Sequence, residues 1–370
     1  MRILQLLAHG HVGGTETFAI SLVKGLNERG HHAVLANAWT DSTADAPARA
    51  AGIPFAPLRA GTYRIGWKWM GVVGHYLRSN RFDIVQTYGL RASLAVRLMQ
   101  RRVGIVHHVT GVRGLDQQRT GVQAFLDRRT EHRLDMIICN AQAVAARRMA
   151  LVGTPAHRIR VIPNGIDVSY FQTGVAPPPR DALGLPGGFL FATVASFRAE
   201  KDHANLLDAI VLAGDELADV GFVFIGAGRL QADVWDRVRE KNLIGRVRFI
   251  APLQDVRDHV RSCDAFVLPS SSEGMPRALM EAMALGKPVI ATDAGGIPEV
   301  ARDDHEAILA PARDPRALAE AMIRIRRDAA LRARLSSAAV RRIRDHFSHT
   351  AMFEQHIRVY EGVLQSCSDE

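Results

Sequence analysis

Two glutamates, Glu273 and Glu281, have the residue type and spacing that most directly indicate chemistry in this 370-residue chain. Pro276 suits the first position of a helix, and Gly274 allows a ligand to approach the backbone closely. The N–H groups at such a helix start bind anions. The loop with Glu273 and Gly274 and the helix start at Pro276 therefore predict an anion site, with the Glu273 carboxylate at its entrance.

Glu281 is the exception in the otherwise apolar stretch 278–285, which predicts a buried helix. An unpaired buried carboxylate would cost several kcal/mol, roughly as other buried polar groups do, so Glu281 needs hydrogen-bond donors. Sugar hydroxyls would supply them, and so would a neighbouring arginine or a backbone amide. The sequence leaves both interpretations open.

A glycine-rich turn comes early in the chain. The apolar run 3–8 predicts a strand, and Gly13-Gly14 precedes a helical pattern with Phe18, Leu22, Val23 and Leu26 on one face. Gly30 suits the end of that helix, and 32–38 resumes as a strand. This is a βαβ unit whose first turn is rich in glycine.

Strands and helices alternate along the rest of the chain. Strands are predicted at 83–87, 104–109, 135–139, 189–195, 221–225, 246–250, 264–268 and 288–291. Helices are predicted at 66–79, 91–102, 203–213, 230–242 and 276–285, followed by two or three more. Such alternation indicates α/β domains with parallel sheets, and ligands bind beyond the carboxyl ends of the strands. The stretch with Pro177-Pro178-Pro179 is interpreted as a linker, which gives two Rossmann-like domains facing across a cleft.

The composition, 47% hydrophobic and 23% charged, is that of a globular chain, and its N-terminus lacks the pattern of a secretory signal. Residues 1–170 carry 22 Lys and Arg against 10 Asp and Glu, whereas residues 171–370 carry 25 against 28. A positive first half would attract nucleic acid, an anionic membrane or a phosphorylated substrate. Nucleic acid is disfavoured, because no helix-turn-helix, zinc-finger or RNP-like pattern occurs.

The chain resembles the retaining nucleotide-sugar glycosyltransferases of family 4 (glycosyltransferases group 1). Six segments carry the resemblance in order, and together they extend over most of the chain: Gly13-Gly14-Thr15-Glu16, Ile162–Asp167 with Phe171, Phe197–His203, Gly226-Ala227-Gly228, Glu273 with Glu281, and Gly295–Glu299. The resemblance implies the GT-B fold, with a C-terminal helix that crosses back to the N-domain. The expected domains are 1–170 for the acceptor, 171–345 for the nucleotide-sugar donor, and the helix in 346–370.

The resemblance also implies roles for individual residues. Arg198 and Lys201 would clamp the donor diphosphate and stabilise the leaving nucleoside diphosphate. Glu273 would contact the transferred sugar and Glu281 the ribose. The remaining donor-site residues would be Gly13, Gly14, Thr110, Gly226, Gly228, Gly274, Met275 and Pro276, while His9, Glu16, His108 and Arg113 would face the acceptor.

Two positions depart from the family pattern. Thr110 stands where the family has a histidine that helps hold the sugar and the diphosphate, so His108 or Arg113 would have to supply the cation. The usual Gly-Arg before the clamp loop is Ala195-Ser196 here, with the arginine two places later as Arg198.

No metal and no other cofactor is expected. The chain has no Asp-x-Asp motif, and its paired histidines lie in or beside strands, where neighbouring side chains point to opposite faces. The charge of a diphosphate would then be met by Arg, Lys and helix N-termini.

Relatives often use a basic, aromatic N-domain surface to dock on membranes. The segment 62–73, with Trp67 and Trp69, suits such a surface, although two core tryptophans would give the same pattern. The sequence therefore predicts a cytoplasmic protein with a peripheral place on the inner face of the cytoplasmic membrane.

The resulting hypothesis is a metal-independent, retaining glycosyltransferase of the hexosyltransferase type. It would move a sugar from a UDP- or GDP-linked donor to a hydroxyl acceptor, lipid-linked acceptors included, in polysaccharide or cell-envelope synthesis. A sugar-nucleotide epimerase of the same fold and a non-catalytic nucleotide-sugar-binding scaffold remain alternatives. A nicotinamide oxidoreductase is disfavoured, because residues 9–14 lack the G-x-G-x-x-G fingerprint.

Overall fold

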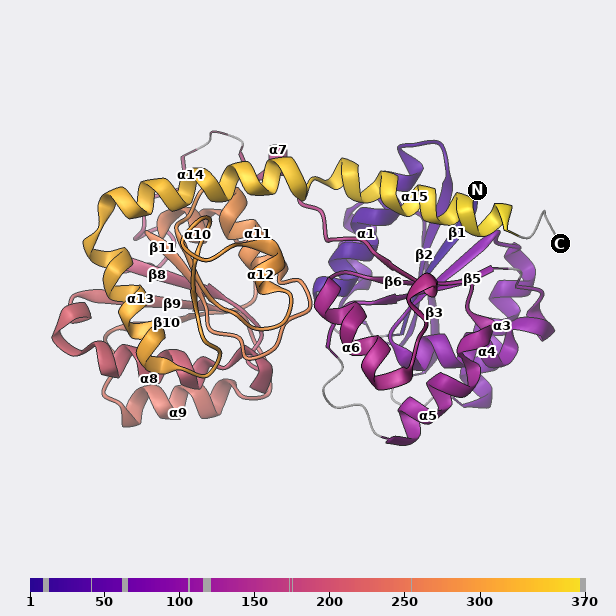
Figure 1. Cartoon of the computed structure of the whole chain (residues 1–370), viewed down its shortest axis with the longest axis horizontal. Helices are drawn as coiled ribbons and strands as arrows, with labels where there is room; N and C mark the ends of the chain where they lie inside the picture. Colours follow the sequence, from indigo (N-terminus) through magenta and orange to yellow (C-terminus); the bar gives the residue numbers. More distant parts are fainter. Residues whose placement is uncertain are drawn as a thin grey trace. The chain divides into compact units, whose positions relative to one another are not determined.

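The chain divides into two compact units in the computed structural model, and each is described by itself (Figure 1). Unit 1 comprises Met1–Asn164 with His349–Glu370, and unit 2 comprises Gly165–Ser348. The structure describes residues 1–8, 13–40, 42–61, 66–105, 107–115, 121–172, 174, 176–253 and 255–366. The boundaries expected at 170/171 and 345/346 fall within a few residues of the observed ones.

Unit 1 is built on a parallel sheet of seven strands in the order β3-β2-β1-β4-β5-β6-β7. The strands are β1 (Arg2–Leu7), β2 (His32–Trp39), β3 (Phe55–Gly61), β4 (Ile84–Tyr88), β5 (His107–Val112), β6 (Met136–Cys139) and β7 (Ile159–Val161). The inner strands are almost wholly buried, as expected for a parallel sheet that is covered on both faces.

Two layers of helices cover this sheet. One consists of α1 (Gly14–Asn27), α2 (Asp45–Ala50) and α15 (His349–Gln365), whose apolar side chains share a core. The other begins with α3 (Trp67–Asn80) and α4 (Leu90–Val103) and continues through α5 (Gly121–Thr130) and α6 (Gln142–Val152) (Figure 1). Two single 3-10 turns, η1 (Glu131–Arg133) and η2 (Ala156–Arg158), complete the unit.

A closed ring of buried hydrogen bonds fixes α15 on the sheet. The Tyr360 hydroxyl accepts from the side-chain amide of Gln5 at 3.1 Å and donates to that of Gln86 at 2.5 Å. Gln86 donates to the Tyr88 hydroxyl at 3.0 Å, and Tyr88 donates to Gln5 at 2.6 Å. All four side chains are buried, so each polar group depends on the ring for its hydrogen bonds.

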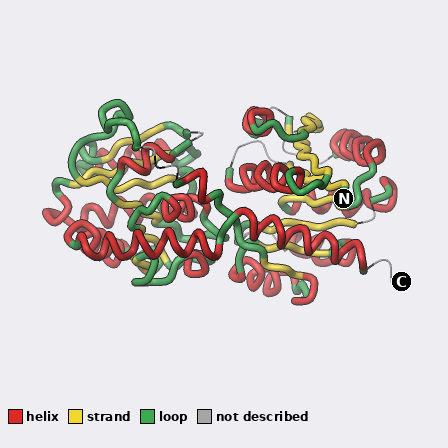
Figure 2. The backbone as a smooth tube through the Cα atoms, turned by 90° about the horizontal axis from the view of Figure 1, so that it is seen from above, coloured by secondary structure: helices red, strands yellow, loops and turns green. Residues whose placement is uncertain are grey.

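Unit 2 contains a parallel sheet of six strands in the order β10-β9-β8-β11-β12-β13, between helices on both faces (Figure 2). The strands are β8 (Phe189–Val194), β9 (Val220–Ile225), β10 (Val247–Ile250), β11 (Ala265–Leu268), β12 (Val289–Thr292) and β13 (Ile308–Ala310). The helices are α7 (Val168–Phe171), α8 (His203–Ala213), α9 (Gln231–Glu240), α10 (Arg257–Ser262), α11 (Arg277–Ala284), α12 (Ile297–Val300), α13 (Pro315–Arg327) and α14 (Ala329–His346), with the 3-10 turns η3 (Ala199–Lys201) and η4 (Gly214–Leu217).

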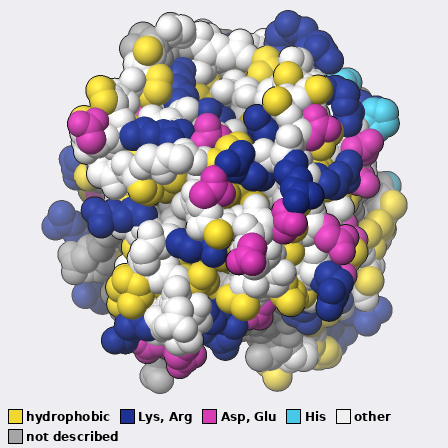
Figure 3. Space-filling model, turned by 90° about the vertical axis from the view of Figure 1, so that its left-hand side faces the viewer, with side chains coloured by type: hydrophobic (Ala, Val, Ile, Leu, Met, Phe, Trp, Pro, Cys, Tyr) yellow, Lys and Arg dark blue, Asp and Glu magenta, His cyan; other side chains and the backbone are white. Residues whose placement is uncertain are grey.

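Exposed charges of opposite sign alternate on the face of unit 2 seen in Figure 3. Ion pairs of unit 2 include Arg326–Asp219 at 2.7 Å and Arg334–Asp304 at 3.2 Å. Among the described residues, no helix is long and apolar enough to cross a membrane.

The predicted fold class, two Rossmann-like α/β domains, is confirmed. The strand predicted at 104–109 is wrong in its position, because Gly104 takes a left-handed conformation and ends α4, so β5 begins at His107. Three edge strands, β3, β7 and β13, were not predicted. β3 and β7 are only partly buried, so their apolar patterns are weak, and β13 is mostly buried but has only three residues.

Replacing Tyr360 by Phe is expected to lower the free energy of unfolding by about 1–3 kcal/mol, because it leaves the Gln5 amide and the Gln86 carbonyl unpaired in the core. Urea unfolding measures the change. The matched control is Tyr76→Phe, which removes a half-buried hydroxyl that makes no hydrogen bond to the described residues. Equal losses in the two variants would contradict the role given to the ring.

Candidate functional site

The carboxylate of Glu273 lies beyond the carboxyl end of β11, in the loop that leads to α11. Glu273 is 8% exposed, and its Oε1 accepts from the Ser270 hydroxyl at 2.7 Å and from the Lys201 ammonium at 2.5 Å. No hydrogen bond from the described residues reaches its Oε2. One carboxylate oxygen is thus held by the protein, while the other keeps its full capacity to accept.

The backbone of this loop is fixed by its own contacts. The Thr292 hydroxyl, at the end of β12, donates to the Ser270 carbonyl, and the Gly296 amide donates to the Glu273 carbonyl at 3.1 Å. The Ser271 amide donates to the Glu200 carbonyl at 2.9 Å, which joins the loop to the segment that carries Lys201. Ends of neighbouring parallel strands therefore build the site together, as expected for this fold class.

Arg198 directly precedes the turn η3 after β8, and Lys201 is the last residue of that turn. The Arg198 side chain is exposed and makes no hydrogen bond or ion pair with the described residues, whereas Lys201 is half-buried against Glu273. Asp202 follows in a left-handed conformation with φ of 46°, and its side chain caps the start of α8. The turn places two cations within three residues of each other at the same edge of the sheet as Glu273.

Gly226 and Gly228 have a packing reason to be glycine. A Cβ atom at Gly226 would overlap the Ala195 carbonyl, and one at Gly228 would overlap the backbone of Phe197. The residues that follow β9 thus lie directly against the segment that leads from β8 into the turn η3. A role in shaping a nucleoside pocket stays a prediction.

Glu281 has a protein partner, Arg277, one helical turn earlier. The Arg277 Nε donates to Glu281 Oε1 at 2.6 Å, and both side chains are partly exposed on α11. An arginine therefore supplies the donor that the sequence called for. Most apolar residues of α11 are buried as predicted, while the Glu281 side chain itself is only partly buried. Its contact with a ribose stays a prediction. The i,i+4 spacing of Arg277 and Glu281 was a readable signal for this pair.

The predicted residues of unit 1 are in part exposed and in part buried. Gly13 and Gly14 are exposed at the N-terminus of α1, while Glu16 is buried in its first turn. In unit 2, the predicted donor-site residues next to Glu273 are buried, namely Gly274, Met275 and Pro276. His9 and residues 62–65 lie outside the described residues.

Thr110 and His108 are inside the sheet of unit 1. The Thr110 hydroxyl lies 3.3 Å from that of Thr87, which also contacts His108 Nε2 at 3.0 Å. Burial and the nearby Arg97 lower the pKa of His108 to about 3. His108 is therefore neutral at physiological pH, and the suggestion that it replaces the missing cation is wrong.

Arg113 lies at the position where a cation was expected, directly after β5 at the carboxyl edge of the sheet. Its guanidinium is 3.3 Å from the centroid of the Phe18 ring, and it donates to the Asn164 side chain. Arginine keeps its charge at every physiological pH. Of the two residues proposed to supply the cation in unit 1, Arg113 is the one that can.

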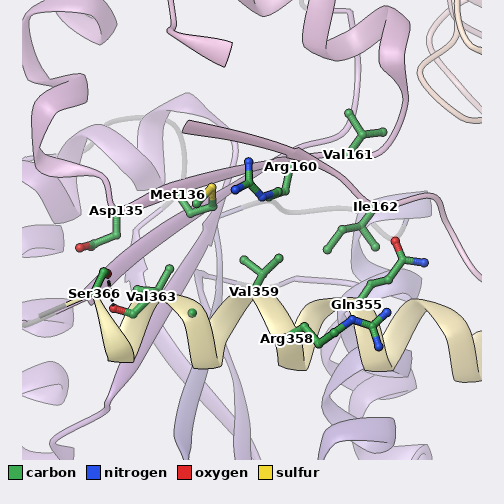
Figure 4. A pocket seen from close by; sticks show the side chains of 11 residues that line it. Asp135, Met136, Arg160, Val161, Ile162, Gln355, Arg358, Val359, Val363 and Ser366 are labelled. Atoms are coloured by element: carbon green, nitrogen blue, oxygen red, sulfur yellow. Dashed lines mark hydrogen bonds between the residues drawn. The ribbon is translucent and has the colours of Figure 1, made fainter. Parts of the chain in front are cut away.

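A hollow of about 510 Å³ in unit 1 is separate from all of these residues. It lies between β6, β7 and α15, where Met136, Ile162 and Val359 line it (Figure 4). None of the predicted site residues lines it. The described residues also contain no cluster of three His, Cys, Asp or Glu side chains that could hold a metal ion.

Comparisons with known proteins identify the family. The sequence model described as "Glycosyl transferases group 1" matches residues 180–342, and the one described as "Glycosyltransferase Family 4" matches residues 12–170. The chain belongs to this glycosyltransferase family. Its two units are the two domains of a GT-B glycosyltransferase.

Relatives match over much of their length. The chain is 25% identical over 358 residues to the lipopolysaccharide core biosynthesis glycosyltransferase LpsD of Rhizobium meliloti, covering 95% of this chain and 96% of LpsD. It is 25% identical over 267 residues to the UDP-Gal:alpha-D-GlcNAc-diphosphoundecaprenol alpha-1,3-galactosyltransferase of Escherichia coli, covering 69% of each. The crystal structure of Anabaena HepE in complex with UDP-glucose is similar in fold, with a TM-score of 0.85 at 20% identity over the whole of both chains.

Three buried histidines predict a loss of stability in acid. Burial lowers the pKa of His108 to about 3, and burial is also the main cause that lowers the pKa of His203 and His356 to about 4. The unfolded chain takes up these protons below its ordinary histidine pKa of about 6.5, and the folded chain does not. As far as these histidines are concerned, the free energy of unfolding is therefore constant above about pH 6.5. It falls as the pH is lowered from there toward the folded pKa values of about 3 to 4, below which both states are protonated and it levels off.

The variant His356→Leu tests this. Between about pH 6.5 and 4, the slope of the free energy of unfolding against pH should fall by about 1.4 kcal/mol per pH unit, the contribution of one proton. Urea unfolding across this range measures the slope, which is independent of any constant change in packing. An unchanged slope would show that His356 takes up its proton in the folded chain as it does in the unfolded chain, and would contradict the lowered pKa.

Proposed function

We propose that this protein is a retaining, metal-independent glycosyltransferase that moves a hexose from a nucleoside-diphosphate sugar to a hydroxyl acceptor in the synthesis of a polysaccharide or cell-envelope glycoconjugate. The observation that carries the proposal is the half-buried pair of Lys201 and Glu273, with Arg198 beside it at the carboxyl edge of the sheet. The relatives named above support the donor class and the acceptor class. The E. coli relative acts on a lipid-linked acceptor, and the HepE crystals hold UDP-glucose.

The two cations would bind the donor diphosphate. Lys201 pairs with Glu273, and the side chain of Arg198 is exposed. A diphosphate that enters would give Arg198 a partner and would share the Lys201 ammonium with Glu273. As the bond to the sugar breaks, charge increases on the diphosphate, and both cations would stabilise it more strongly than in the ground state.

Retention would follow from attack on the same face of the sugar from which the diphosphate leaves. The bond between the anomeric carbon and the phosphate oxygen breaks, a bond to the acceptor oxygen forms, and the acceptor proton passes to the leaving phosphate. The cationic sugar that develops needs a nearby negative charge. Glu273 would supply it through Oε2, while Ser270 and Lys201 hold Oε1.

A thermal-shift screen with UDP, GDP, ADP and NAD, each with and without EDTA, tests the donor site. A nucleotide present at 100 times its dissociation constant should stabilise the folded state by roughly 2.7 kcal/mol. Lys201→Ala should abolish most of this shift, whereas Lys241→Ala, which breaks the ion pair with Asp208 elsewhere in unit 2, should leave it intact. Stabilisation by NAD alone would refute the proposed donor class. A shift that is lost in EDTA would refute the proposed metal independence.

Glu273→Gln tests the catalytic step. Turnover of the donor found in the screen, measured as slow release of its nucleoside diphosphate to water, should fall at least about a hundredfold, as after loss of other electrostatic stabilisers of a transition state, while the KM for the donor changes little. Ser270→Ala should lower kcat about tenfold to a hundredfold, because a hydrogen bond to a charged group contributes about 1.5–3 kcal/mol.

In a Glu273→Gln background, Ser270→Ala should have little further effect, because Ser270 acts through Glu273. Additive losses would show that Ser270 serves only the fold. Turnover to a sugar epimer without an acceptor would favour the epimerase, and nucleotide binding without any turnover would favour the scaffold.

A further inference from the structure

The hydroxyl of Thr292 holds the backbone from which Ser270 reaches the Glu273 carboxylate. It donates to the Ser270 carbonyl, and the Ser270 hydroxyl in turn donates to Glu273 Oε1 at 2.7 Å. Thr292 and Ser270 are both fully buried. No other hydrogen bond from the described residues reaches the Ser270 carbonyl, so this buried acceptor depends on Thr292.

The backbone of Thr292 is fixed on the side away from Ser270. Thr292 is the last residue of β12 and pairs with Ala310 of β13, and the next amide, that of Asp293, donates to the Ala310 carbonyl at 2.9 Å. On the other side, the pairing of β12 with β11 ends at Ala291 and Leu268. The Thr292 hydroxyl therefore continues the link between β11 and β12 beyond their last paired residues. A β-branched side chain suits this place, because its χ1 angle is restricted.

The second partner of Glu273 is less able to set the direction of the carboxylate. The Lys201 ammonium lies 2.5 Å from the same Oε1, but a charge at the end of a flexible four-carbon chain attracts a carboxylate from many directions. The Ser270 hydroxyl, in contrast, is carried by a short side chain on a backbone that Thr292 holds. The orientation of the carboxylate, and with it the direction of Oε2, is therefore set through Ser270 and Thr292.

We propose that Thr292 is a positioning residue for the transferase reaction. It fixes the Ser270 backbone, so that Glu273 presents Oε2 to the sugar where positive charge develops. The inference rests on the proposed function, because that function gives Glu273 its role. A displacement of about 1 Å in a catalytic group can lower a rate about a hundredfold, so a hydroxyl that touches no substrate can still determine turnover.

Thr193 offers a matched control for a purely structural role. Its hydroxyl is also buried, and it donates to the Val267 carbonyl of β11 at 3.0 Å, three residues before Ser270. Each threonine thus supplies a buried carbonyl with a donor from a neighbouring strand, Thr193 from β8 and Thr292 from β12. Of these two carbonyls, that of Ser270 belongs to a residue that contacts the Glu273 carboxylate.

The kinetics of Thr292→Val, which removes the hydroxyl and keeps the shape of the side chain, test the proposal. With the donor found in the thermal-shift screen, kcat for release of the nucleoside diphosphate to water should fall about tenfold to a hundredfold. The KM for the donor should change little, because Arg198 and Lys201 still bind the diphosphate. Thr292→Ser keeps the hydroxyl and should keep most of kcat.

Thr193→Val should lower the free energy of unfolding much as Thr292→Val does, because each leaves one buried carbonyl unpaired, but it should leave kcat and KM unchanged. In a Glu273→Gln background, Thr292→Val should have little further effect, because Thr292 acts through Glu273. The nucleotide-induced thermal shift checks that each variant is folded. If Thr292→Val does not fold, Thr292→Ala is compared with Thr292→Ser in its place.

Three results would overturn the inference while leaving the proposed function intact. They are an unchanged kcat in Thr292→Val, an equal loss of kcat in Thr292→Ser or Thr193→Val, and additive losses of kcat for Thr292→Val and Glu273→Gln. Absence of turnover by the unaltered protein with every donor would refute the proposed function itself, and this inference with it.

Discussion

The buried hydroxyl of Tyr360 joins the two ends of the chain, and the arrangement of unit 1 depends on it. The chain leaves this unit at Asn164 and returns at His349, so its last helix must find the sheet again after nearly two hundred intervening residues. An apolar helix face alone would allow α15 to slide or rotate. The hydrogen-bond ring with Gln5, Gln86 and Tyr88 permits one position, because any shift leaves buried polar groups unpaired. Gly25 adds a steric constraint, since a Cβ there would overlap the Phe353 ring of α15.

Unit 2 faces a different constraint, which is to hold a carboxylate where little water reaches it. Burial removes the Glu273 side chain from water, and Lys201 with Ser270 supplies hydrogen bonds in place of water at a single oxygen. A site that satisfied both oxygens would be more stable but would leave nothing for a ligand. The same logic applies to Arg198, whose lack of a partner among the described residues makes it ready for an anion. In the proposed reaction, both groups would gain partners when the donor binds.

Helices, strands and loops could be predicted from the sequence where their local residue patterns are strong. Residues whose roles depend on contacts between distant parts of the chain could not be predicted. The face of α1 with Phe18 and Leu22, and the loop from β11 to α11, follow from periodicity and from Gly and Pro. Glu273, Lys201 and Arg198 were found through motif resemblance. Ser270 and Thr292 were missed, because their roles come from strands that are neighbours only in the folded sheet. For the same reason the sequence could not show that the Thr87 hydroxyl contacts both Thr110 and His108 inside unit 1.

The distribution of charge in unit 1 has one structural origin. In the layer formed by α3, α4, α5 and α6, Asp127 is the one acidic residue, and it pairs inside the layer with Arg97 and Arg148. Every other Lys or Arg of these four helices is exposed, and no Asp or Glu of these helices is exposed. Asp127, Arg97 and Arg148 neutralise one another inside the layer, so the excess of cations in the first half of the sequence becomes an excess on the outer surface of these helices.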